Sequence, residues 1–202
     1  MATSIILFFK LVGSLIVSFL LSIFFTKKII EISNKKKASQ IEREYLENHI
    51  AKKGTPTMGG IGFVLASVIT FLLFNFNNSL SYSVLAVLLS YIGFFIIGFI
   101  DDYLKVKIKS YAGLSAKIRI LLEIVLCMYI ILILKDGGFT LDRLYLPLLD
   151  YFIETAYLFL PFFLIALIGS ANAINLSDGL DGLASGLAMI ALTPFLLISL
   201  II

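Results

Sequence analysis

Two adjacent carboxylates follow directly after an apolar segment of the chain. Asp101 and Asp102 come after Tyr82–Ile100, a run of nineteen residues without a charged side chain. Adjacent carboxylates repel each other, and the partial negative charge at the C-terminal end of a helix disfavours them further. A positive partner is therefore expected, either a lysine, a bound divalent cation or both; a solvated helix end is the alternative reading. The lysines that follow are Lys105, Lys107 and Lys109.

A second polar stretch, Asn172–Gly182, contains two aspartates three residues apart. Asp178 and Asp181 would share a face if the segment were helical, whereas its glycines would allow tight turns instead. An Asx/Gly turn without a ligand is the alternative reading. Carboxylate oxygens and the amide oxygen of Asn175 are hard ligands, which suit magnesium or manganese rather than zinc or copper.

Two further motifs combine glycine with lysine, whose ammonium group suits phosphate. Lys52–Gly60 reads Lys-Lys-Gly-Thr-Pro-Thr-Met-Gly-Gly, a glycine-rich turn that lacks the spacing of a Walker loop. Gly113–Lys117 reads Gly-Leu-Ser-Ala-Lys, and its serine, Ser115, is expected to cap the helix that follows. Within that helix, Arg119 is expected either to reach lipid phosphate or to pair with Glu123 one turn later.

The elements that must position these motifs are membrane-spanning helices. The 202 residues are 60% hydrophobic and only 14% charged, which indicates an all-α, polytopic membrane helix bundle. No span alternates polar and apolar residues, so a β-barrel is not expected. The single cysteine, Cys127, lies within a span and is expected only to pack. The six predicted spans are Ile5–Thr26, Met58–Phe76, Tyr82–Ile100, Lys117–Leu134, Tyr157–Ile174 and Leu183–Ile202.

The basic residues predict how the spans are oriented. The loops after the first and third spans, with the start of the fourth, carry thirteen lysines and arginines, against two on the opposite side. The positive-inside rule then places the N-terminus outside and all four motifs at the cytoplasmic face. Carboxylates and lysines gathered at one face favour phosphoryl transfer between a soluble nucleotide and a lipid, assisted by a magnesium ion.

Two other classes remain open on the residues alone. A transporter or channel would carry carboxylate ion ligands deep within its spans, but only Glu123 lies inside one. A non-catalytic remnant that acts as a binding or assembly subunit would keep the motifs without turnover.

These four motifs, in their order along the chain, resemble the signatures of the phospho-N-acetylmuramoyl-pentapeptide transferases (MraY) over nearly the whole chain. The resemblance implies transfer of phospho-MurNAc-pentapeptide from its UDP carrier to undecaprenyl phosphate, which gives lipid I and UMP in peptidoglycan synthesis. It also implies Mg²⁺, membrane lipids as partners, the bacterial inner membrane and a homodimer, with no nucleic-acid partner.

The resemblance also assigns roles to individual residues. It implies catalytic and metal-ligating roles for Asp101, Asp102 and Asp178, without ranking the adjacent pair. The residues that it implies for substrate and phosphate binding are Lys52, Lys105, Lys117, Asn175 and Asp181.

The chain differs from this family in length and in two expected features. Members have about ten spans and over 300 residues, and a later metal-binding aspartate and a histidine-rich loop have no counterpart here. The sole histidine, His49, does not occupy their place. The chain is therefore expected to be one membrane domain, the N-terminal portion of such an enzyme, and to be inactive by itself.

Overall fold

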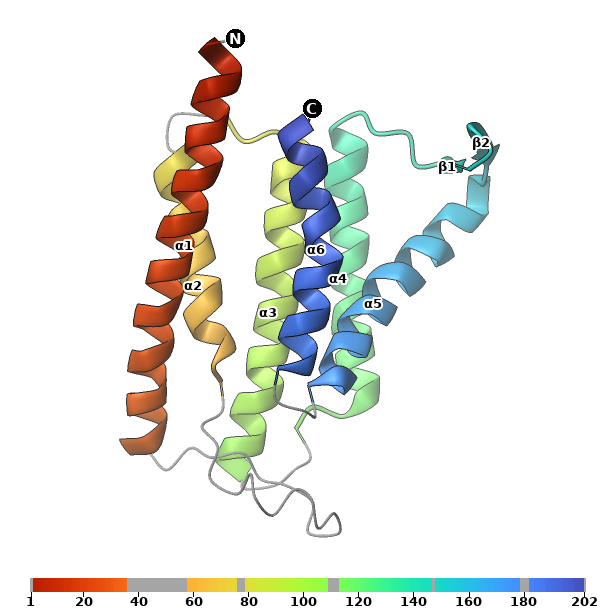
Figure 1. Ribbon diagram of the computed structural model, residues 1–202. Coiled ribbons are helices and arrows are strands. Elements are labelled where there is room, and N and C mark those ends of the chain that lie inside the picture. Colours follow the sequence, from red (N-terminus) through yellow and green to blue (C-terminus); the bar gives the residue numbers. More distant parts are fainter. Residues whose placement is uncertain are drawn as a thin grey trace. The chain divides into compact units, whose positions relative to one another are not determined.

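The computed structural model describes residues 2–35, 58–75, 79–108, 113–146, 148–178 and 182–201. Six α-helices account for most of this part of the chain (Figure 1). They are α1 (Ala2–Lys35), α2 (Gly60–Asn75), α3 (Tyr82–Ile108), α4 (Ala116–Asp136), α5 (Phe159–Ser177) and α6 (Leu183–Ile201). Each overlaps most of one of the six predicted spans, so the predicted helical membrane bundle is confirmed.

Three of the described helices are long and apolar enough to cross a membrane by length and composition. They are Ile5–Lys35 of α1, together with α3 and α5. The apolar parts of α2 and α6 are shorter, and α6 contains Pro194 in its interior. The chain is a multi-pass membrane protein, whereas the direction in which its helices cross stays a prediction.

The described chain falls into two compact units. Unit 1 comprises residues 1–80 and 87–122, and unit 2 comprises residues 81–86 and 123–202. The division passes through α3 and α4. That the chain forms a single membrane domain stays a prediction.

In unit 1, α1 and α2 pack side by side in opposite directions (Figure 1). Gly13, near the start of α1, lies against Phe74 near the end of α2, and Thr26 lies against Gly62 at the start of α2. A Cβ atom on Gly62 would come within 2.5 Å of the Thr26 hydroxyl oxygen and 2.9 Å of its backbone nitrogen. Glycine at this position therefore allows the two helices to approach closely.

In unit 2, a β-hairpin precedes α5, between the predicted spans Lys117–Leu134 and Tyr157–Ile174. Strands β1 (Arg143–Leu146) and β2 (Tyr151–Glu154) pair antiparallel, with Leu144 opposite Ile153. The rings of Tyr145 and Phe152 lie 4.9 Å apart across the pair. Asp150, at φ 48°, occupies a left-handed conformation that aspartate tolerates better than most residues, and it closes the turn. A short 3₁₀ helix, η2 (Ala156–Leu158), leads into α5.

Candidate active site

The two adjacent aspartates lie within α3 and not at its C-terminal end. The helix continues past Ile100 to Ile108, which is about two turns beyond the aspartates. The macrodipole acts mainly in the last turn, so the expected repulsion between the helix end and these carboxylates is wrong. The last turn instead contains Lys105 and Lys107, whose positive charge suits that position.

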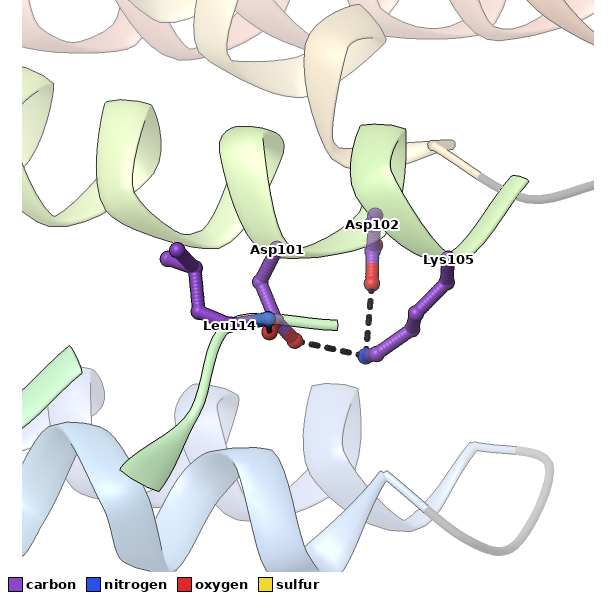
Figure 2. A network of polar contacts seen from close by, with 4 residues as sticks. All are labelled: Asp101, Asp102, Lys105 and Leu114. Carbon is purple, nitrogen blue, oxygen red and sulfur yellow. Dashed lines mark hydrogen bonds and ion pairs between the residues drawn. The ribbon is translucent and has the colours of Figure 1, made fainter. Parts of the chain in front are cut away.

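Lys105 is the positive partner of both carboxylates. Its ammonium nitrogen lies 2.6 Å from Oδ2 of Asp101 and 3.0 Å from Oδ1 of Asp102 (Figure 2). The three residues lie on one helix at spacings of three and four, which bring side chains onto the same face. One lysine thus offsets the mutual repulsion of the two carboxylates. The prediction that a lysine is their positive partner is confirmed.

The two aspartates have different surroundings. The Asp101 side chain is 8% exposed, and its second oxygen, Oδ1, accepts a hydrogen bond of 2.7 Å from the backbone N–H of Leu114 (Figure 2). Both oxygens of Asp101 are therefore engaged by the protein. The Asp102 side chain is 42% exposed and contacts Lys105 through Oδ1. Asp102 is the carboxylate that a ligand can reach.

The hydrogen bond from Leu114 ties the loop before α4 to α3 at Asp101, about two turns before the end of that helix. Gly113, the residue before it, lies so close to Asp101 that a Cβ atom there would contact its Oδ1 and come within 2.7 Å of its backbone oxygen. The sequence pointed to Gly113–Lys117 as a motif but did not reveal this contact. The signal for it was the glycine two residues before the helix-capping serine.

The structure confirms the start of α4 at the predicted cap. Ser115 precedes the helix, its backbone oxygen accepts from Arg119, and its Oγ lies 3.4 Å from the backbone nitrogen of Ile118. Lys117 lies exposed in the first turn. Arg119 is not paired with Glu123 as one expectation had it: its Nε atom is buried and has no hydrogen-bond partner. Glu123 instead accepts from Asn172, at 2.8 Å.

The described part of the second polar stretch is the last part of a helix, with Asp178 and Gly182 outside it. The helix α5 ends at Ser177, and Asp178 already has a non-helical backbone, with φ −78° and ψ 26°. Gly182, at φ 81°, precedes the first residue of α6, which agrees with the glycine-turn reading. Asn175 and Asp178 are both exposed. They belong to unit 2, and that they share one site with Asp102 stays a prediction.

Two of the predicted site residues, Lys52 and Asp181, lie outside the described residues. At the glycine-rich turn the description begins with Met58, which has a left-handed backbone at φ 66°. Its carbonyl oxygen and that of Gly59 accept the first hydrogen bonds of α2, from Ile61 and Gly62. Met58 and Gly59 therefore lead directly into α2.

The described residues fit a magnesium ion that takes few ligands from the protein. Among them, no three carboxyl, thiol or imidazole side chains are grouped so that they could hold a metal ion. Magnesium commonly binds one or two carboxylates and completes its shell with water and substrate phosphate. The exposed carboxylate of Asp102 suits that arrangement, whereas Asp101 is occupied by Leu114 and Lys105.

The apolar helices define a membrane protein. Its α3 carries a polar site in which Asp101 and Asp102 are paired with Lys105. Comparison with known proteins identifies the class: residues 84–202 match the model of glycosyl transferase family 4. This range is more than half of the chain and includes every predicted site residue except Lys52. The chain therefore belongs to glycosyl transferase family 4.

The predicted resemblance to the phospho-N-acetylmuramoyl-pentapeptide transferases is confirmed by individual relatives that bear this name. The chain is 34% identical to the one from Clostridioides difficile over 189 residues, which cover 93% of the chain and 58% of that protein. It is 35% identical to the one from Halalkalibacterium halodurans over 92% of the chain and 58% of that protein. It is 38% identical to the one from Lactobacillus gasseri over 88% of the chain and 56% of that protein. The chain thus spans less than two thirds of the length of these relatives.

Proposed function

We propose that the protein to which this chain belongs transfers phospho-MurNAc-pentapeptide from UDP-MurNAc-pentapeptide to undecaprenyl phosphate, giving lipid I and UMP. The observation that carries the proposal is the cluster of Asp101, Asp102 and Lys105 inside the family-matched region. The names of the relatives supply the sugar and the peptide. The site supports phosphoryl transfer, because an accessible carboxylate beside a lysine suits phosphate chemistry in which charge must be neutralised.

The reaction replaces one phosphoanhydride with another. An oxygen of the lipid phosphate bonds to the phosphorus that bears the sugar, and the bond between that phosphorus and the departing UMP breaks. The protein contributes mainly by positioning and by electrostatic stabilisation, as is general for phosphoryl transfer. A bound magnesium ion would supply positive charge to the diphosphate.

Each predicted site residue has a defined task in this proposal. Asp102 faces the reacting phosphates, as a ligand of the metal or as the acceptor of a proton from the lipid phosphate. Asp101 holds Lys105 and the loop at Leu114 in place, so it is a positioning residue. Lys105 and the exposed Lys117 hold phosphate oxygens. Asn175 and Asp178 contribute from the end of α5, with Lys52 and Asp181 completing the set.

We propose in addition that the site faces the cytoplasm and that the protein acts in the bacterial inner membrane as a homodimer. The bias of thirteen basic residues to two supports the orientation. A cysteine placed at Asp178 in a Cys127→Ala background should be unreactive toward an impermeant thiol reagent added outside intact cells, and reactive once the membrane is opened. Labelling from outside would reverse the orientation.

The experiment that tests the proposed reaction measures UMP release by the complete gene product in membranes. We expect UMP release that requires UDP-MurNAc-pentapeptide, undecaprenyl phosphate and magnesium, and that stops when EDTA removes the metal. UDP-GlcNAc serves as the matched control donor, because it keeps the nucleotide and the diphosphate but lacks the lactyl peptide. Equal turnover of both donors, or turnover that is indifferent to EDTA, would refute the proposed substrate or the proposed metal respectively.

A further inference from the structure

A buried polar pair lies inside unit 2. Glu123 of α4 is 4% exposed, and its Oε2 accepts a hydrogen bond of 2.8 Å from Nδ2 of Asn172 of α5, although the two residues are 49 positions apart in the chain. Ionisable side chains inside membrane helices are costly and are usually paired. Such a pair persists when it fixes one arrangement of the helices or serves the site.

The side-chain amide of Asn172 uses Nδ2 as the donor of two hydrogen bonds. Besides the bond to Glu123, Nδ2 donates to the backbone oxygen of Ile168 one turn earlier, at 2.9 Å. Both amide hydrogens therefore have acceptors, one on its own helix and one on α4. This arrangement sets the rotation of α5 about its axis at Asn172.

The rotation of α5 at Asn172 determines where the end of the helix presents its polar groups. Asn175 lies three residues later, at a spacing that places it near the face of Asn172, and Asp178 follows at the end of the helix. Both are exposed. A displacement of about 1 Å at a reacting centre can cost on the order of 100-fold in rate, so a fixed rotation is valuable here.

The other buried residues of α4 do not offer a polar partner. Along its buried face, Glu123 is followed by Cys127, Ile130 and Ile131. Cys127 is fully buried, one turn from Glu123 on the same face. It provides a matched control for the effect of packing alone, because removing its thiol makes a small cavity without touching Asn172.

We infer that Glu123 is a positioning residue for the end of α5. Through its hydrogen bond to Asn172, it holds Asn175 and Asp178 where the donor substrate binds, and it does not itself touch substrate. The inference rests on the proposed function for the identity of the substrate. It depends on an acceptor oxygen at position 123 and does not require a charge there.

The first test uses Glu123→Gln, Glu123→Leu, Asn172→Leu and the double leucine variant in the complete gene product, with Cys127→Ala as control. Glu123→Gln keeps an acceptor oxygen and should retain kcat and KM within about two-fold. Glu123→Leu should lower kcat/KM for UDP-MurNAc-pentapeptide by about 100-fold, through a higher KM, a lower kcat or both. The double variant should be no worse than either single one, since both remove the same bond. Additive losses, or normal kinetics in Glu123→Leu, would overturn the inference.

The second test does not depend on the reaction. A cysteine at Asn175, in a Cys127→Ala background, reports the environment of the end of α5 through its rate of reaction with a maleimide in detergent. Glu123→Leu should change this rate several-fold, and Glu123→Gln should leave it unchanged. If the labelling follows this pattern while the complete gene product with Asn175 intact turns over no donor, the proposed function fails and the positioning role stands. Equal rates in all three backgrounds would refute the positioning role itself.

Discussion

The backbone N–H of Leu114 donates a hydrogen bond of 2.7 Å to the buried carboxylate of Asp101, thirteen residues earlier in the chain. This bond joins the loop before α4 to α3 at Asp101, inside the helix. Because Asp101 also receives Lys105 at 2.6 Å, both of its oxygens serve the architecture. Its neighbour Asp102 is left as the carboxylate exposed to a ligand.

Gly113→Ala should disrupt the contact between the loop and Asp101. The added Cβ atom has no room beside the carboxylate and the backbone oxygen of Asp101. We expect the variant to lose about 1–3 kcal/mol in the free energy of unfolding, as overpacked sites commonly do, measured as a lower melting temperature in detergent. Gly98→Ala is the control, because a Cβ atom there meets nothing within 4 Å, and its melting temperature should be unchanged or higher. Equal behaviour of the two variants would be evidence against the close contact.

Lys105→Met should destabilise the protein more than Lys107→Met does. Removing Lys105 leaves two adjacent carboxylates, one of them buried, without their cation. The expected cost is about 1–3 kcal/mol, below the full value for a buried pair because the lysine is partly exposed. Lys107 is exposed, and its ammonium lies 5.9 Å from the ring centre of Tyr103, a contact worth about 0.5–1 kcal/mol. Melting temperatures of the two variants in the same detergent decide the point; a larger drop for Lys107→Met would refute the assignment.

The hairpin gives a prediction about pH. The Tyr145 hydroxyl donates a hydrogen bond of 2.7 Å to Asp150, and this bond, with a smaller effect of burial, raises the pKa of Tyr145 above its ordinary value. Because the folded-state pKa is the higher one, the stabilisation is complete below the ordinary tyrosine pKa of about 10. It is lost as the pH rises through the folded-state pKa.

The measurement is an ultraviolet titration of phenolate absorbance, in which the difference between the unsubstituted protein and Tyr145→Phe isolates this tyrosine. Asp150→Asn is the control variant, and it should bring the pKa of Tyr145 down toward its ordinary value. If Asp150→Asn leaves the titration of Tyr145 in place, the hydrogen bond is not the cause of the shift.

The sequence predicted the helices well and the immediate partners less well. Long apolar runs define spans without knowledge of their neighbours, so all six helices were found. The end of α3 was misplaced because Lys105 and Lys107, read as loop residues, extend the helix past the last apolar residue. The hairpin at Arg143–Glu154 was missed because its strands have only four residues each and neither strand has a buried residue.

The contacts that organise the site depend on segments distant in sequence. The sequence pointed to Asp101, Asp102 and Lys105, because charge beside an apolar run is conspicuous. It did not rank the aspartates, since the difference between them is a hydrogen bond from Leu114. It also gave Glu123 the partner available on its own helix, Arg119, whereas the actual partner, Asn172, comes from α5. Local spacing predicts neighbours on one helix and carries no information about the packing of another.

The central claim is that Asp102 serves the transfer reaction and Asp101 serves the architecture. Its most direct measurement compares UMP release from UDP-MurNAc-pentapeptide with the melting temperature for Asp102→Asn and Asp101→Asn in the complete gene product. We predict that Asp102→Asn keeps its melting temperature and loses ~100- to 1,000-fold in kcat, the usual cost of removing a fixed electrostatic group. Asp101→Asn should lower the melting temperature as well as the rate. Near-normal turnover by a stable Asp102→Asn variant, or its failure to fold, would contradict this account.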